Sequence, residues 1–173
     1  MLIIFTGNGK GKTTAAIGQA LRAVGDGKKV LMVEFIKGPW QSGEDISHKA
    51  LSPSFSIVKT GKGFVGILGD TMPREVHEQA AHEGLEFARN EIGEKKWDML
   101  ILDEIWNALS LGLVSHEDVD SFLEYSKKYV EHVIMTGRDC PAYFIARADI
   151  VTEMKEIKHP FEKGVYGTKS IEF

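Results

Sequence analysis

The sequence predicts an α/β fold in which a mostly parallel sheet carries helices on both faces. Short apolar runs of strand length alternate along the chain with longer stretches of helical periodicity. The first apolar run leads through a glycine-rich turn straight into a helical stretch, and a later run ends in two acidic residues. Strands joined by helices pair in parallel through right-handed crossovers, so these elements are expected to form one sheet.

The glycine-rich turn lies between the apolar run 2–5 and the helical stretch 12–24, and reads Gly7-Asn8-Gly9-Lys10-Gly11-Lys12-Thr13-Thr14. Glycines let backbone amides converge on an anion at the positive end of the following helix. Lys12 would reach the phosphates, and the Thr13 hydroxyl would complete the coordination of Mg²⁺. The turn is therefore predicted to be a phosphate-binding loop (P-loop) for a nucleoside triphosphate, although Thr6 replaces the first glycine of the strict pattern. The alternative, a solvated glycine-rich turn, is disfavoured by the strand before it and the helix after it.

The remaining elements follow in alternation. Expected strands are 29–36, 55–59, 97–104, 131–136 and the strand-like segment 149–157; expected helices are 73–94, 105–113, one that starts at Ser115, and 142–148. The segment 37–44 is expected to be a loop. The segment 60–70 combines four glycines with apolar residues, which suits a mobile flap over a ligand.

A second motif, 99–104, consists of four apolar residues followed by Asp103 and Glu104. Acids at the end of a buried strand hold magnesium in P-loop proteins, directly or through water. Glu104 has two interpretations, because an acid at this place either binds metal or polarises a water molecule. Ligands of parallel sheets sit beyond the carboxyl ends of the strands, so the P-loop, these acids and the turns at Lys37 and 136–138 should meet at one edge.

Composition limits the classes of function. The 173 residues are expected to form a single domain, 1–173, with 43% apolar residues and a net charge of -4. This charge argues against nucleic acid as the main partner. The chain has no apolar run long enough for a membrane span and no leader pattern, and its single cysteine suits a reducing compartment, so a cytoplasmic protein is expected. His77 and His82 are five residues apart on a predicted helix and are interpreted as surface residues, because a zinc pair needs a spacing of four.

Together the motifs resemble the P-loop type of ATP:corrinoid adenosyltransferases, also called cob(I)alamin adenosyltransferases. The resemblance spans nearly the whole chain and rests on the blocks 5–16, 22–25, 35–38, 60–64, 102–104, 136–140, 148–149 and 158–161 with Gly164. It implies a RecA-like α/β fold and a homodimer. It also implies transfer of the 5′-deoxyadenosyl group of ATP to cobalt(I) of a corrin ring, with release of inorganic triphosphate. A flavodoxin-like reductase is a candidate electron donor.

The residues make chemical sense of that reaction. Cobalt(I) is already a strong nucleophile, so the protein must align C5′ and neutralise the leaving triphosphate rather than supply a base. We expect Lys12, Thr13 and Glu104 to be catalytic, and Thr13, Asp103 and Glu104 to hold Mg²⁺. The expected ATP-binding residues are Gly7, Asn8, Gly9, Lys10, Gly11, Lys12, Thr13, Thr14, Arg22 and Arg138. The resemblance further implies that ATP lies reversed in the loop, with C5′ toward the acceptor.

The flap is expected to bind the corrinoid through Phe64, Val65, Gly66, Ile67 and Leu68. Phe64 would displace the lower axial base of cobalamin, which makes cobalt easier to reduce. Two departures from the family are expected to matter: the N-terminal extension that often helps to cover the corrinoid in the family is not expected here, and Gly66 stands where a tryptophan is common.

Two other functions stay open. An ordinary P-loop ATPase or phosphotransferase would use Glu104 to position water and would yield ADP and phosphate. A nucleotide-binding regulator without turnover would use the flap to dock a partner. Adenosyl transfer alone predicts triphosphate.

Overall fold

A computed structural model describes residues 1–38, 40–67, 69–160, 164 and 167–171. Within these residues six strands form one sheet in the order β3-β2-β4-β5-β1-β6, and every neighbouring pair is parallel. The predicted α/β sheet is thereby confirmed. The strands are β1 Leu2–Thr6, β2 Val30–Glu34, β3 Phe55–Lys59, β4 Met99–Asp103, β5 His132–Thr136 and β6 Ile150–Glu153.

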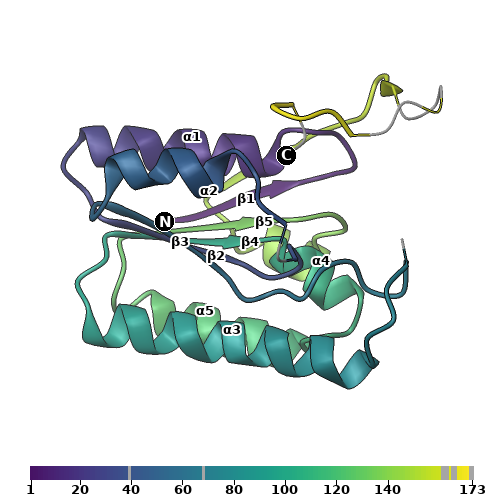
Figure 1. Ribbon diagram of the computed structural model, residues 1–173. Helices are drawn as coiled ribbons and strands as arrows, with labels where there is room; N and C mark the ends of the chain where they lie inside the picture. The colour runs from purple at the N-terminus through teal and green to yellow at the C-terminus, as the bar shows by residue number, and fades with distance from the viewer. Residues whose placement is uncertain (39, 68, 161–163, 165–166, 172–173) are drawn as a thin grey trace.

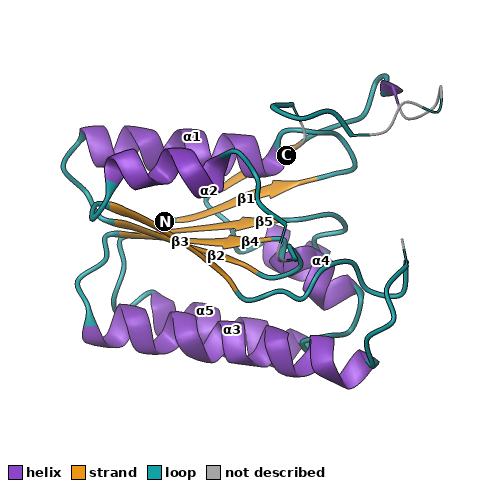
Figure 2. Ribbon diagram, viewed as in Figure 1, coloured by secondary structure: helices purple, strands orange, loops and turns teal. Residues whose placement is uncertain are grey.

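Helices cover both faces of the sheet, α1 and α2 on one side and α3 and α5 on the other (Figures 1 and 2). The helices are α1 Lys12–Gly25, α2 Glu44–Ser47, α3 Arg74–Glu94, α4 Ile105–Ser110, α5 His116–Ser126 and α6 Ala142–Ile145, with a 3-10 turn η1 at His48–Leu51. The short α2 and η1 were not predicted, because elements of four residues are too short to show a helical period. Several elements end a few residues earlier in the structure than the sequence predicted, because the apolar residues used for the prediction continue into the following turns.

The core lies in two layers, one on each face of the sheet. On one face, the small side chains of Ala16, Ala20 and Ala23 bring α1 close to the strands. On the other face, larger apolar side chains of α3, α4 and α5 pack against the sheet, among them Leu85, Trp106 and Phe122. Strands β1, β2 and β4 are buried along their whole length because both faces of the sheet are covered. Burial on both faces explains why their sequences are nearly continuous apolar runs.

The strands all point the same way, so the loops that follow them meet at one edge of the sheet (Figure 2). Strand β5 lies between β1 and β4, so its last residue, Thr136, lies between the end of β1, where the P-loop begins, and Asp103 at the end of β4. This edge therefore holds both sequence motifs. In the part of the chain that the structure describes, no helix has both the length and the apolar composition needed to cross a bilayer.

His77 is buried, so the expectation of a surface residue was wrong; His82 is exposed as expected. The flap folds back on the start of α3, where Nε2 of His77 lies 3.0 Å from Oδ2 of Asp70. The Asp70 carboxylate also accepts hydrogen bonds from the backbone N–H groups of Gly66 and Met72. His77 therefore anchors the base of the flap. The periodicity of α3 alone does not show this long-range contact.

Candidate active site

The P-loop wraps around the ammonium group of Lys12. Its Nζ donates to the carbonyl oxygens of Gly7, at 2.6 Å, and Gly9, at 2.8 Å. Burial lowers the pKa of Lys12, and the positive charge of Arg138 lowers it further, while the carboxylates of Glu104 and Asp103 oppose that shift. The cation is thus held inside the loop, where it can meet the phosphates of a nucleotide.

Two loop glycines have a role that the sequence did not reveal. A Cβ at Gly7 or Gly9 would lie 2.5 or 2.7 Å from the carbonyl oxygen of Met154, just after β6. That oxygen accepts the N–H of Gly9 at 2.6 Å. The loop is therefore packed against the β6 end of the chain. The Gly9 amide is used within the protein, whereas the loop amides were expected to be free for phosphate.

Asp103 is the centre of the expected metal site. It is fully buried, and its Oδ1 accepts a hydrogen bond of 2.6 Å from the Thr136 hydroxyl. Its Oδ2 lies 3.2 Å from the Thr13 hydroxyl, so the residues predicted for Mg²⁺ from the P-loop and from β4 are in contact. A hydroxyl and a carboxylate are ligands that Mg²⁺ prefers.

The donor set fits a metal that arrives with its nucleotide. Among the described residues, no group of three His, Cys, Asp or Glu is placed to hold a metal by itself. Mg²⁺ in P-loop proteins is commonly held by one or two carboxylates together with substrate phosphates. Thr13 and Asp103 supply a set of that kind.

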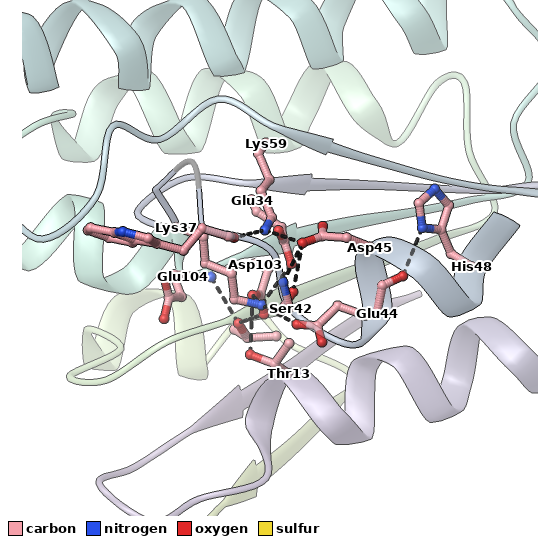
Figure 3. A network of polar contacts seen from close by, with 12 residues as sticks. Thr13, Glu34, Lys37, Ser42, Glu44, Asp45, His48, Lys59, Asp103 and Glu104 are labelled. Atoms are coloured by element: carbon pink, nitrogen blue, oxygen red, sulfur yellow. Dashed lines mark hydrogen bonds and ion pairs between the residues drawn. The ribbon is translucent and has the colours of Figure 1, made fainter. Parts of the chain in front are cut away.

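A buried ion-pair cluster lies next to this site (Figure 3). The Lys37 ammonium is 2.7 Å from Oε1 of Glu34, 3.0 Å from Oε1 of Glu44 and 3.3 Å from Oδ2 of Asp103. Burial opposes the charge, but the carboxylates of Asp103 and Glu34 outweigh it and raise the pKa of Lys37. Lys37 therefore stays charged and neutralises part of the acidic site.

Glu34 has the least favourable environment in this cluster. Its side chain is fully buried, and Oε2 has no hydrogen-bond partner among the described residues. Burial raises the pKa of Glu34 to about 7, against the opposing effect of Lys37. Sequence reasoning missed this residue, although its signal resembles that of Asp103: an acid that ends an apolar strand. The register of the sheet places the two acids side by side on β2 and β4.

We expect Glu34→Gln to change how stability depends on pH. The pKa of Glu34 is about 7 in the folded protein and 4.5 at its ordinary value, so the folded state binds the proton more tightly. The resulting stabilisation is full below pH 4.5 and is lost as pH rises through 7. From pH 5 to pH 8, the variant should gain on the order of 3 kcal/mol in unfolding free energy relative to wild type. Urea titrations across this range measure the difference.

The exposed carboxylate Glu117 offers a matched control, because Glu117→Gln should leave the pH profile of wild type unchanged. Parallel profiles for wild type and Glu34→Gln would contradict the buried, proton-binding state of Glu34.

Glu104 differs from its neighbour Asp103 in backbone conformation. Its φ of 62° is in the left-handed region, which is costly for a residue with a side chain. Its N–H donates to the Thr136 hydroxyl at 2.9 Å, which holds this conformation where β4 turns into α4. Figure 3 shows the carboxylate lying apart from the contacts of Asp103. Burial, followed by the negative charge of Asp103, raises the pKa of Glu104 to about 7.

The other expected nucleotide ligands are divided in space. Asn8, Lys10 and Thr14 are exposed on the P-loop. Arg138 follows β5, and its backbone N–H donates a hydrogen bond of 3.0 Å to Oδ1 of Asn107. Its positive charge is close enough to Lys12 to lower the pKa of that residue. The structure does not bring Arg22 to this group. It lies exposed in the last turn of α1, about 14 Å along the helix axis from Thr13.

The flap residues also differ from one another. Phe64 and Ile67 expose their side chains, whereas Val65 is half-buried and packs against the core. Gly66 has a φ of 68° and gives its N–H to Asp70. Leu68 lies outside the described residues. The apolar surface of the flap is thus carried by Phe64 and Ile67 rather than by the whole segment.

Comparison with known proteins identifies the family. Residues 1–173 match the family described as ATP:corrinoid adenosyltransferase BtuR/CobO/CobP. A corrinoid adenosyltransferase of Escherichia coli (strain K12) is 38% identical over 173 residues, which cover 100% of this chain and 85% of that protein. The corrinoid adenosyltransferase CobA of Salmonella typhimurium (strain LT2) is 36% identical, with the same coverage.

The fold has a counterpart among solved structures. The flagellar accessory protein FlaH of Methanocaldococcus jannaschii matches with a TM-score of 0.52 at 14% identity, over 88% of this chain and 69% of that one. At this identity the likeness concerns the fold alone, and it agrees with the expected RecA-like P-loop class. By its match over the full length, the chain belongs to the ATP:corrinoid adenosyltransferase BtuR/CobO/CobP family.

Proposed function

We infer that this protein transfers the 5′-deoxyadenosyl group of ATP to cobalt(I) of a corrinoid and releases inorganic triphosphate. Family membership over the whole chain supports the reaction. The structural observation that carries it is the contact of Thr13 with buried Asp103 at the P-loop, at the edge of the sheet beyond which the exposed residue Phe64 follows β3. A nucleotide site and an apolar surface therefore lie at the same end of the sheet.

In the proposed reaction the electron pair of cobalt(I) forms the bond to C5′, and the C5′–O bond breaks with its electrons leaving on the triphosphate. Lys12, Arg138 and the free amides of the P-loop bind and neutralise that leaving group. Thr13 and Asp103 would hold Mg²⁺, with Glu104 beside them; the bound ion would add positive charge at the triphosphate. No residue has to act as a base, because the nucleophile carries no proton to be removed.

Product analysis tests this function. ATP and chemically reduced cobalamin should give adenosylcobalamin and triphosphate in equal amounts. ADP and phosphate would instead indicate a P-loop ATPase or phosphotransferase, and the absence of any product would indicate a nucleotide-binding regulator.

Glu104→Gln separates the metal role from the water-activating role. If Glu104 serves the metal, the variant should lose about 10- to 100-fold in turnover and need more Mg²⁺ for half-maximal rate, with no ATP hydrolysis left behind. Steady-state rates over a Mg²⁺ titration measure both effects. Strong corrinoid-independent phosphate release by the wild type, abolished in this variant, would instead assign Glu104 to water activation.

Three further features are proposed and await direct tests. The flap, above all Phe64, binds the corrinoid and displaces its lower base; the protein works as a homodimer; and a flavodoxin-like reductase supplies electrons. Light scattering of the purified protein tests the dimer, and reduction assays with flavodoxin test the donor. A cytoplasmic location also stays a prediction, which cell fractionation would test.

A further inference from the structure

We propose that Trp40 forms, together with Phe64, the surface on which the corrin ring of the second substrate lies. The inference rests on the proposed function, because it names where the corrinoid binds. It starts from a pair of aromatic rings that come from different loops. Trp40 follows β2, Phe64 follows β3, and their ring centroids are 5.9 Å apart at an interplanar angle of 34°.

The Trp40 ring is exposed, while its backbone carbonyl group is bound within the protein. Trp40 as a residue is 63% exposed and Phe64 is 45% exposed, whereas Trp97 and Trp106 are buried. The Trp40 carbonyl oxygen accepts a hydrogen bond of 2.8 Å from Lys59, which also pairs with Asp45. Covering a large exposed apolar ring with a ligand removes apolar surface from water, which contributes favourably to the free energy of binding.

Two glycines support the ring from one side. A Cβ at Gly38 would lie 2.7 Å from the Trp40 ring and 2.9 Å from the Cα of Gly63. A Cβ at Gly63 would lie 3.2 Å from the same ring. The Gly63 N–H donates to the carbonyl oxygen of Ile36, which joins the two loops. Side chains at these two positions would crowd the Trp40 ring, so the glycines leave room for it against the backbone. We call the rings of Trp40 and Phe64 the platform.

The platform lies close to the expected nucleotide site. Lys37 lies three residues before Trp40 and contacts Asp103, the expected metal ligand. Three residues span at most about 10 Å, so the aromatic pair lies close to the edge where ATP is expected. Transfer between C5′ and cobalt requires the two substrates to be neighbours. A corrin ring on this platform meets that requirement.

The shape and polarity of the platform favour a corrin over a smaller flat ligand. The flap and the turn after it also carry the exposed apolar residues Ile67 and Met72, which add to the apolar surface that this region offers to a ligand. A corrin is a wide, nearly flat macrocycle with methyl groups and amide side chains around its edge, so aromatic faces and aliphatic side chains suit its apolar ring surface. Adenine on Trp40 is the competing arrangement, and ATP affinity distinguishes the two.

Binding of cob(II)inamide and cob(II)alamin, measured anaerobically by calorimetry with Mg²⁺ and ATP but no reductant, tests the proposal. Trp40→Ala should weaken the affinity for both corrinoids 10-fold or more, and equally, because the ring that Trp40 would contact is common to both corrinoids. ATP affinity should stay within 2-fold of wild type. Trp40→Phe should restore corrinoid affinity to within about 3-fold, since it keeps an aromatic face.

The matched control is Tyr129→Ala, which removes an exposed ring from another aromatic pair, Tyr125–Tyr129, after α5. This variant should bind both corrinoids as wild type does. Unchanged corrinoid affinity in folded Trp40→Ala would overturn the proposal, and so would a matching loss of ATP affinity or a loss confined to cobalamin. If wild type bound cobinamide tightly but formed no adenosyl product, the proposed reaction would be refuted. The affinities of Trp40→Ala would still decide whether Trp40 contacts the corrin ring. Wild type that binds no corrinoid would refute both.

Discussion

Lys12→Ala is expected to lower kcat/KM for adenosyl transfer by 100- to 1,000-fold. The Lys12 ammonium is held by the carbonyl oxygens of Gly7 and Gly9 at the centre of the P-loop, where it can oppose the charge of the leaving triphosphate. Removal of one preorganised electrostatic group from an active site typically costs about 3–4 kcal/mol in the transition state. Initial rates of adenosylcobalamin formation and triphosphate release measure the effect.

A lysine outside the site supplies the control. Lys127 is exposed and pairs with Glu124 on the surface, so Lys127→Ala should keep wild-type rates. Circular dichroism should show that Lys12→Ala remains folded. Near-normal transfer by the folded Lys12→Ala variant would rule out the assignment of Lys12.

Lys37→Met is expected to have the largest effect on stability. The substitution keeps most of the length of the side chain but leaves the buried carboxylates of Glu34 and Asp103 without their counter-ion. Loss of one partner from a buried ion pair typically costs 3–5 kcal/mol, about 6–20 °C in Tm for a chain of this size. Because protonation relieves the unpaired charge, the loss should be smaller at pH 5 than at pH 8. Urea unfolding at both pH values tests the direction and the size.

Lys127→Met again serves as the control, because exposed ion pairs contribute about 1 kcal/mol or less. A Lys37→Met variant as stable as that control at pH 8 would show that the buried cluster does not depend on its ammonium group.

Local patterns in the sequence sufficed for most of the fold and for the centre of the site. The P-loop, the acids that end β4 and the capping box of Ser115 and Asp118 each consist of neighbouring residues whose spacing reflects short-range geometry. Apolar runs and helical periodicity likewise depend on local burial, so the alternation of strands and helices could be predicted. The parallel pairing followed from that alternation.

The tertiary structure decided the features that depend on residues far apart in the chain. The register of β2 against β4 places Glu34 beside Asp103, and the packing of Met154 on the P-loop explains Gly7 and Gly9. The same long-range folding buries His77 against the flap and brings Trp40 against Phe64. These contacts arise from strand register and loop packing. Strand register and loop packing depend on how two distant segments fit against each other. Neither segment alone therefore shows a periodic or compositional pattern from which the contact could be predicted.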